Sequence, residues 1–163
     1  MKTEFALPDT RPVDGRCTNI KAPTLTFLAS KNEALSVTAL EEDIVRVAFC
    51  PDGSPRFDRT WLLPSKEGEF PAEGKRRDDF SAFSLPEPTI QTIGEWVSLR
   101  TALLHVEINP QTFALRWSTS SGTYLAADLE KAPYLYNIHG EPVAHQLVCS
   151  KSETYYGFGE TSG

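Results

Sequence analysis

Short apolar segments alternate with turn residues along most of the chain. The clearest pair covers residues 34–40 and 44–50, joined by the acidic turn Glu41-Glu42-Asp43. The second segment is rich in β-branched residues and is short for a helix, which favours a strand. Pro51-Asp52-Gly53 then provides a turn, because proline presets φ and glycine tolerates positive φ. The pattern predicts a β-hairpin over residues 34–50.

Further strands are predicted at residues 24–28, 95–100, 103–109, 113–118, 123–125, 134–138 and 143–149. Trp96, Val97 and Leu99 are the core candidates in the strand at 95–100. Turn residues recur about every 8–12 positions, and no long segment has the 3.6-residue period of a helix. We therefore expect an all-β domain, an antiparallel β-sandwich with low helix content.

Residues 54–88 interrupt this pattern. Prolines and glycines are dense there, and proline opposes both helix hydrogen bonding and sheet pairing. The segment also contains Trp61, Phe70, Phe80 and Phe83, which is too much apolar surface for a disordered linker. Long loops in compact domains usually bind something or pack on a neighbour. We expect an ordered excursion that packs against another surface.

The composition and net charge of the chain exclude some classes of function. The 163 residues carry a net charge of -6 with a pI near 5.1, which argues against a nucleic-acid partner. The basic run Lys75-Arg76-Arg77 is followed by two aspartates and is interpreted as a solvated loop. No apolar run reaches the length of a membrane span, and the first residues have no apolar core of signal-peptide length, so secretion is not expected. Cys17, Cys50 and Cys149 have no paired spacing, so reduced thiols and a cytoplasmic location are expected.

The sequence offers only weak candidates for a metal site or a catalytic site. His139, Glu141 and His145 are the nearest approach to a metal site, but Gly140 and Pro142 indicate a turn without a third ligand at metal-site spacing. The run at 150–152, Ser-Lys-Ser, lacks the strand-turn-helix context of a nucleophile. Carboxylates are plentiful, yet none lies in a segment that marks a catalytic cleft. Pattern and spacing therefore predict no catalytic residue and no metal site.

The run Tyr155-Tyr156-Gly157-Phe158-Gly159-Glu160 resembles the Tyr-Gly-(Leu/Phe)-Gly-Glu motif of glycoside hydrolase family 31, the α-glucosidase family. Residues 106–116 are similar to a strand-turn-strand unit of that family. Residues 121–125, together with Asp128, are similar to the hairpin that follows this unit in the family. Residues 59–61, 70–77 and 83–86 resemble a loop found in some members. The resemblance extends over about residues 20–163, and its specificity comes from the order and spacing of these motifs.

The resemblance implies the N-terminal β-sandwich of such an enzyme, of the galactose-mutarotase-like type. Residues 1–20 would be an N-terminal extension and residues 21–163 the sandwich, ending before a (β/α)8 barrel. In the family, that barrel carries the nucleophile and the acid/base, both aspartates, so this chain would be non-catalytic. The implied reaction is retaining hydrolysis of α-glycosidic bonds without a cofactor. The implied partners are an α-linked oligosaccharide and the chain's own barrel; α-xylosidase, transglycosylase and lyase activities also occur in the family.

Two roles stay open for Tyr156, Phe158 and Glu160 in the terminal motif. The resemblance implies a place at the substrate pocket or the barrel interface, near the mouth of the active site. The alternative is packing within the edge of the sandwich. Neither role is catalytic.

Two other functions also stay open. An independent carbohydrate-binding module would present exposed aromatic rings, for which Trp61, Trp96 and Trp117 are candidates, although the strand pattern is expected to bury the last two. A mutarotase-type epimerase would need a histidine and a carboxylate on a concave sheet face, where His105 and Glu107 are the candidates.

Overall fold

The computed structural model describes residues 10–11, 15–64, 71–137 and 143–149. Every regular element in these residues is a β-strand, and every strand pair is antiparallel. The strands are β1 (Thr10–Arg11), β2 (Gly15–Lys21), β3 (Thr24–Ala29), β4 (Ala34–Ala39), β5 (Val45–Cys50), β6 (Arg59–Thr60), β7 (Lys75–Arg76), β8 (Thr89–Ile93), β9 (Trp96–Arg100), β10 (Leu104–Ile108), β11 (Leu115–Thr119), β12 (Tyr124–Ala127), β13 (Tyr134–Asn137) and β14 (Val143–His145). The predicted all-β fold with low helix content is confirmed.

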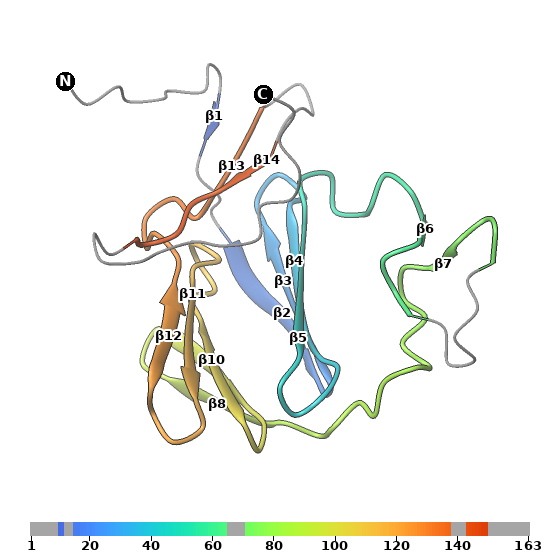
Figure 1. Cartoon of the computed structure of the whole chain (residues 1–163). Coiled ribbons are helices and arrows are strands. Elements are labelled where there is room, and N and C mark those ends of the chain that lie inside the picture. The colour runs from blue at the N-terminus through green and yellow to red at the C-terminus, as the bar shows by residue number, and fades with distance from the viewer. Residues whose placement is uncertain (1–9, 12–14, 65–70, 138–142, 150–163) are drawn as a thin grey trace, which may run out of the picture.

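Two larger sheets form the layers of the sandwich (Figure 1). One is four-stranded with the order β2-β3-β4-β5, and the other is five-stranded with the order β12-β11-β10-β9-β8. A three-stranded sheet, β1-β13-β14, lies across one end of the two layers. Among the described strands, β5 is therefore an edge strand of its sheet.

The core lies between the two larger sheets. In β3, Leu25 and Phe27 point inward and are fully buried, while Thr26 between them is only partly buried. Val97 and Leu99 of β9 meet them from the opposite layer, so their predicted burial is confirmed. Each such side chain contributes about 1.5–3 kcal/mol when it is removed from water. This alternation of inward and outward residues holds the two sheets together.

Trp96 was predicted to be a core residue, and that prediction is wrong. Successive side chains of a strand point to opposite faces, so the burial of Val97 and Leu99 forces Trp96 to the outer face. There the Arg116 guanidinium lies over its indole ring at 3.8 Å from the ring centroid.

The predicted hairpin over residues 34–50 is confirmed as β4 and β5. Their register runs from the pair Ala34 and Cys50 to the pair Ala39 and Val45. Gly53 follows β5 with φ of 80°, a conformation that glycine adopts without steric cost, and the turn returns the chain alongside β5.

The small end sheet is attached to the core by aromatic rings. Tyr134 and Tyr136 of β13 are buried, and Tyr134 stacks on Phe49 of β5 with 4.6 Å between ring centroids. The Tyr136 hydroxyl donates a hydrogen bond to the buried carboxylate of Glu33. These contacts close one end of the sandwich.

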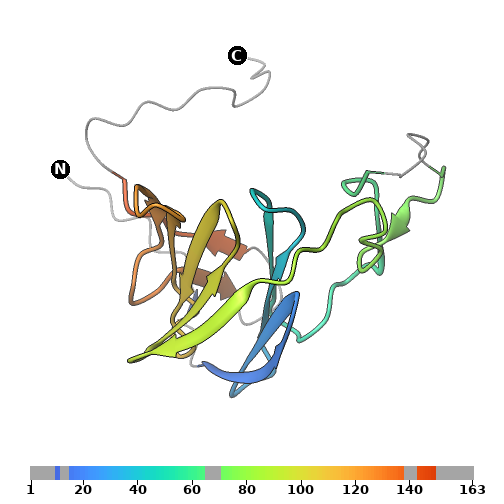
Figure 2. The ribbon, with the colours of Figure 1, turned by 90° about the horizontal axis from the view of Figure 1, so that it is seen from below.

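The excursion between β5 and β8 projects to one side of the sandwich (Figure 2). The described part of it contains a two-stranded sheet, β6 with β7, which the proline-rich sequence did not indicate. Arg59 donates hydrogen bonds to the carbonyls of Glu73 and Gly74, the two residues before β7. Trp61 donates from its indole nitrogen to the Ala72 carbonyl at 3.1 Å. The described part of the excursion thus has defined local structure, and its packing against another surface stays a prediction.

Candidate functional site

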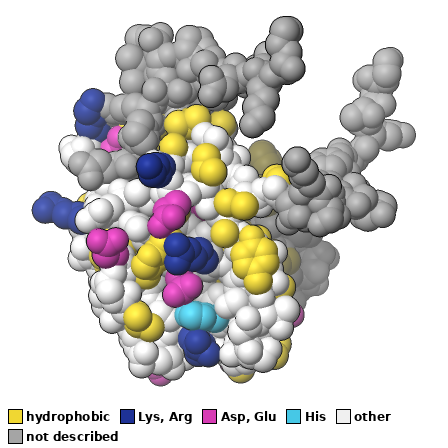
Figure 3. Space-filling view, turned by 90° about the vertical axis from the view of Figure 1, so that its left-hand side faces the viewer, with side chains coloured by type: hydrophobic (Ala, Val, Ile, Leu, Met, Phe, Trp, Pro, Cys, Tyr) yellow, Lys and Arg dark blue, Asp and Glu magenta, His cyan; other side chains and the backbone are white. Residues whose placement is uncertain are grey.

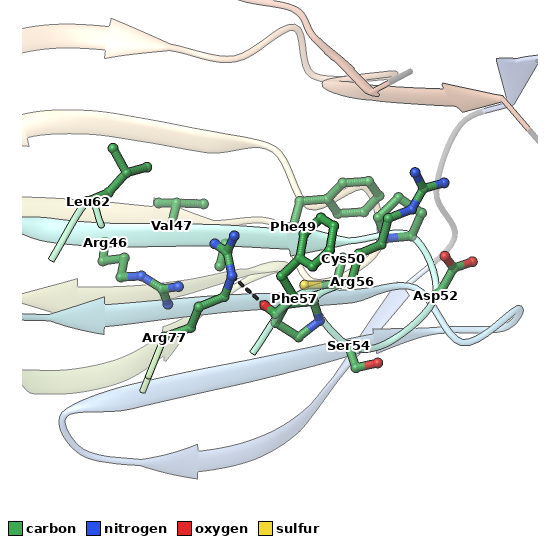
Figure 4. Close-up of a pocket in the computed structure, with 13 residues that line it drawn as sticks. Arg46, Val47, Phe49, Cys50, Asp52, Ser54, Arg56, Phe57, Leu62 and Arg77 are labelled. Carbon is green, nitrogen blue, oxygen red and sulfur yellow. Dashed lines mark hydrogen bonds between the residues drawn. The ribbon is translucent and has the colours of Figure 1, made fainter. Parts of the chain in front are cut away.

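A groove runs beside the free edge of β5, with a volume of about 720 Å³ (Figure 4). One side is β5 from Arg46 to Cys50, and the other is the returning chain through Phe57, together with Leu62 and Arg77 from the excursion. We call this the β5 groove. It brings together a strand of the sandwich and two distant parts of the excursion.

The apolar side of the β5 groove is an unfinished part of the core. Val47 and Phe49 pack against the core but are only partly buried, whereas their partners on β4, Val37 and Leu35, are fully buried. Leu62, on the excursion side of the groove, is 89% exposed. Apolar side chains therefore face an open space on both sides.

The charged residues of the β5 groove are Arg46, Arg56, Arg77 and Asp52, of which Arg46 and Arg77 lie beside each other. Arg46 is partly buried, and its guanidinium lies over the Phe80 ring at 5.5 Å from the centroid. Burial, and next the nearby charge of Arg77, lower the pKa of Arg46. Arg77 donates from Nε to the Phe57 carbonyl at 2.6 Å, and its guanidinium approaches the same part of the groove (Figure 4). Among the described residues, neither Arg46 nor Arg77 forms an ion pair with a carboxylate.

A second candidate surface is the outer face of the five-stranded sheet, where acidic and basic side chains alternate in a row with a histidine (Figure 3). His105 of β10 lies 2.8 Å from the Ser98 hydroxyl through Nε2 and 3.2 Å from the Arg100 guanidinium through Nδ1. Because a guanidinium only donates, Nδ1 is the acceptor and Nε2 carries the hydrogen. Burial, then the Arg100 charge, lower the pKa of His105, while Glu107 opposes this shift. Both ring nitrogens have protein partners, which argues against a role of His105 as an epimerase base.

The tryptophans do not form one aromatic platform. Trp117 is partly buried against the core from β11, and Trp96 is covered on one face by Arg116. Trp61, in the excursion, is 63% exposed. Of the three rings proposed for a binding module, Trp61 alone combines high exposure with a fixed indole orientation.

A third cluster surrounds Asp128, which lies in the turn after β12. Its side chain is fully buried, accepts the Leu115 amide at 3.0 Å and lies 2.9 Å from His145 Nε2. Burial raises the pKa of Asp128, and His145 and the Leu115 amide oppose the rise. His145 also stacks on Tyr134 with 4.7 Å between ring centroids. The cluster fastens β14 to the sandwich, which gives His145 a structural partner in place of the metal considered above.

Several residues singled out from the sequence lie outside the described residues. They are Tyr156, Phe158 and Glu160 of the terminal motif, His139 and Glu141 of the weak metal cluster, and the serine and lysine run at 150–152. Within the described part of the chain, no group of three metal-ligating side chains comes together. The same part contains no helix long and apolar enough to span a membrane.

Sequence reasoning did not single out Arg46 or Arg77. Arg77 was interpreted as part of a solvated run, and the structure brings it into the β5 groove. The available signal was the position of Arg46, a charged residue within the apolar strand that follows Ile44. Its counterpart on the excursion could not be identified without the fold.

Comparison with known proteins identifies the family. The model of the glycosyl hydrolase 31 N-terminal galactose mutarotase-like domain matches residues 34–163. The chain belongs to this family. No curated protein matches the chain at a significant level.

Solved structures of glycoside hydrolase family 31 (GH31) enzymes share the fold. The Flavobacterium johnsoniae GH31 dextranase complexed with glucose has a TM-score of 0.71 at 16% identity, and covers 94% of this chain and 17% of its own. A variant of that dextranase complexed with isomaltotriose gives 0.69 at 17% identity, with the same coverage. The cycloalternan-forming enzyme of Listeria monocytogenes, in complex with a pentasaccharide substrate, gives 0.50 at 17% identity, covering 78% of this chain and 10% of its own.

The chain thus spans less than a fifth of the length of these enzymes. At identities of 16–17%, the similarity to these structures shows a shared fold alone. The resemblance seen in the sequence motifs is confirmed by the family model, and the chain is the N-terminal domain type found in GH31 enzymes.

Proposed function

We propose that the chain is the non-catalytic N-terminal domain of a retaining α-glycoside hydrolase with α-glucosidase-like activity. The observation that carries the proposal is the match to the family's N-terminal domain over residues 34–163. The family resemblance implies that the catalytic aspartates belong to a (β/α)8 barrel beyond this domain. The described residues offer a sandwich core and a projecting excursion, and both suit a domain that supports a neighbouring catalytic unit.

The physical role follows from the construction of barrel enzymes. A barrel active site opens at the C-terminal ends of its strands, where added segments shape specificity. A sandwich docked beside that opening forms part of its wall and limits the entry of bulk water, while the water that hydrolyses the glycosyl-enzyme still has access. The excursion supports this role, because Trp61 projects from it with 63% of its surface exposed. Its hydrogen bond to the Ala72 carbonyl fixes the ring for contact with a neighbour.

The proposed substrate is an α-linked oligosaccharide or glucoside. The similar enzymes were solved with glucose, isomaltotriose and a pentasaccharide, which supports a carbohydrate as the ligand class. Retaining hydrolysis needs two carboxyl groups about 5–5.5 Å apart. One is a carboxylate that attacks the anomeric carbon, and the other is a carboxylic acid that protonates the leaving oxygen of the same glycosidic bond. Among the described residues we assign no such pair.

Turnover of an aryl α-glucoside tests the proposal. The complete protein is expected to release the aryl group, and the 163-residue chain alone is expected to release none. Activity of the isolated chain would contradict the non-catalytic assignment. An inactive complete protein, assayed on α-glucosides, α-xylosides and isomaltooligosaccharides, would contradict the hydrolase assignment.

The rival function is an independent carbohydrate-binding module, and the exposure of Trp61 is the observation that favours it. Calorimetric titration of the isolated chain with isomaltotriose separates the two functions. A support domain is expected to bind weakly or not at all. Binding that disappears in Trp61→Ala, and persists in the control Leu129→Ala, would favour the binding module.

A further inference from the structure

The outer face of the four-stranded sheet carries a second cavity next to the β5 groove, with a volume of about 430 Å³. Alternate residues of β4 and β5 pack into the core, so the residues between them point outward. Two outward cross-strand pairs, Ala34 with Cys50 and Ser36 with Ala48, form the floor. Excursion residues, among them Phe80, complete the wall. We call this the outer-face cavity, and every residue that lines it belongs to the described part of the chain.

Two guanidinium groups meet at the outer-face cavity. Arg46 projects from the outward face of β5, and Arg77 comes from the excursion. Both residues are partly buried. The carboxylates on the cavity are Asp58, which is exposed, and Asp78, which pairs with Arg76 at 2.9 Å. Among the described residues, no carboxylate forms an ion pair with Arg46 or Arg77, so two adjacent positive charges face the same space.

Both guanidinium groups are held in place by contacts that leave hydrogen-bond donors available. Arg46 makes a cation–π contact with the Phe80 ring, 5.5 Å from its centroid. Arg77 donates from Nε to the Phe57 carbonyl at 2.6 Å, and its backbone amide donates to the Asp58 carbonyl at 2.8 Å. The terminal nitrogens of Arg77 stay available as donors. Groups that are positioned before a ligand arrives lose less freedom when they bind it.

The chemistry of this pair selects an oxyanion. A guanidinium presents its N–H donors in a planar fork, which matches the oxygens of a carboxylate or a phosphate. An oxyanion between Arg46 and Arg77 would also offset the repulsion between their charges. That repulsion, after burial, lowers the pKa of Arg46.

The floor beside the arginines is small and apolar. Arg46 and Ala48 are two residues apart on the same face of β5, which separates them by roughly 7 Å. Ala34 and Cys50 continue the floor beyond Ala48. Sites for small molecules typically combine an apolar lining with a few convergent polar groups in about 300–1,000 Å³. The outer-face cavity fits this description.

We propose that the outer-face cavity binds a small organic oxyanion, a carboxylate or a phosphate monoester, with its charged group between Arg46 and Arg77. The body of the molecule lies over Ala48 and the neighbouring floor. This assignment does not rest on the proposed function, because it uses only residues of the four-stranded sheet and the excursion.

Calorimetric titration of the full 163-residue chain with phenyl phosphate and with benzoate tests the site. One molecule is expected to bind per chain. Arg46→Met and Arg77→Met are each expected to weaken binding by about tenfold or more, because each removes charged hydrogen bonds. Arg16→Met is the matched control and should change the affinity less than about twofold, since Arg16 is exposed on β2 and lines neither cavity. No saturable binding of either probe, or equal losses in the three variants, would overturn the proposal.

Two further probes separate the charged group from the body of the ligand. Neutral phenol is expected not to bind, and inorganic phosphate is expected to bind about fivefold or more weakly than phenyl phosphate, because the ring covers apolar surface. The tighter of phenyl phosphate and benzoate identifies the preferred oxyanion. Phenol that binds as tightly as both charged probes, or inorganic phosphate that equals phenyl phosphate, would overturn the proposal.

Alkylation of Cys50 locates the ligand in the wild-type chain, without any variant that could unfold. Cys50 lines the cavity and is partly buried, whereas Cys149 is exposed and lies outside it. The bound oxyanion would cover the Cys50 thiol and offset the arginine charges that favour its thiolate. The tighter probe, at saturation, is expected to slow the reaction of Cys50 with N-ethylmaleimide by about threefold or more, with Cys149 unchanged. Unchanged alkylation of Cys50 would overturn the proposed location.

Discussion

Asp128 is a polar residue whose removal we expect to destabilise the domain strongly. Its fully buried carboxylate accepts the Leu115 amide and pairs with His145, so Asp128→Ala leaves a buried N–H without a partner. The expected loss in the free energy of unfolding is about 2–4 kcal/mol. Chemical denaturation of the isolated domain measures it.

Glu130 provides the control for Asp128. It forms an exposed ion pair with Arg116 at 3.4 Å, and Glu130→Ala is expected to cost less than about 1 kcal/mol. Similar losses in the free energy of unfolding for Asp128→Ala and Glu130→Ala would contradict the prediction that burial and the Leu115 hydrogen bond make Asp128 the more important of the two.

His105 makes a testable contribution to the pH dependence of stability. Its pKa in the folded chain is lowered from the usual 6.5 by burial and by Arg100, so folding favours the neutral ring. The stabilisation is present above about pH 6.5 and is lost as the pH falls toward the lowered pKa. Between pH 7.5 and 5.5, the wild type should therefore lose more stability than His105→Gln. Parallel melting curves for both proteins measure the difference, and equal losses would contradict a lowered pKa of His105 in the folded chain.

At the residue scale, hydrophobicity alone identified part of the core. Val97 and Leu99 were predicted from an apolar run, and the same run led to the wrong prediction for Trp96. Hydrophobicity does not decide which of two adjacent residues faces inward; the register with β8 and β10 does. The sequence likewise did not indicate that Asp128 is buried, because its burial depends on β14, which follows later in the chain.

At the element scale, the excursion depends on Arg59. Its side chain donates to the Glu73 and Gly74 carbonyls and so holds β6 against β7. Arg59→Ala is expected to open this two-stranded sheet while the sandwich stays folded. Limited proteolysis should then cut within residues 54–88 several times faster than in the wild type. Arg76→Ala, which removes the exposed ion pair with Asp78, should leave the cleavage rate unchanged; equal rates in all three proteins would contradict the role of Arg59.

The predictability of each element follows its residue pattern. The hairpin of β4 and β5 was predicted because both strands are apolar and a turn separates them. β2 was missed because most of its side chains are exposed, so no apolar alternation marks it. β6 and β7 were missed because each covers only two residues in a proline-rich segment and is held by Arg59 side-chain hydrogen bonds.

For the whole molecule, the sequence motifs indicated the family and the fold, and both are confirmed. They did not indicate the β5 groove, because Arg46 and Arg77 meet only after the excursion folds back beside β5. Motifs report what relatives share, whereas a groove between distant segments depends on three-dimensional packing. The roles of Tyr156, Phe158 and Glu160 stay predictions.

The anomeric configuration of the first sugar released by the complete protein tests the central claim most directly. Proton NMR would follow the product of an α-linked glucoside from the first minutes of reaction, with the isolated 163-residue chain run in parallel. We predict that the complete protein releases the α-anomer first, with the β-anomer formed later by mutarotation, because double displacement retains configuration. The isolated chain should release neither. Initial release of the β-anomer, or any release by the isolated chain, would contradict a non-catalytic domain of a retaining α-glycoside hydrolase.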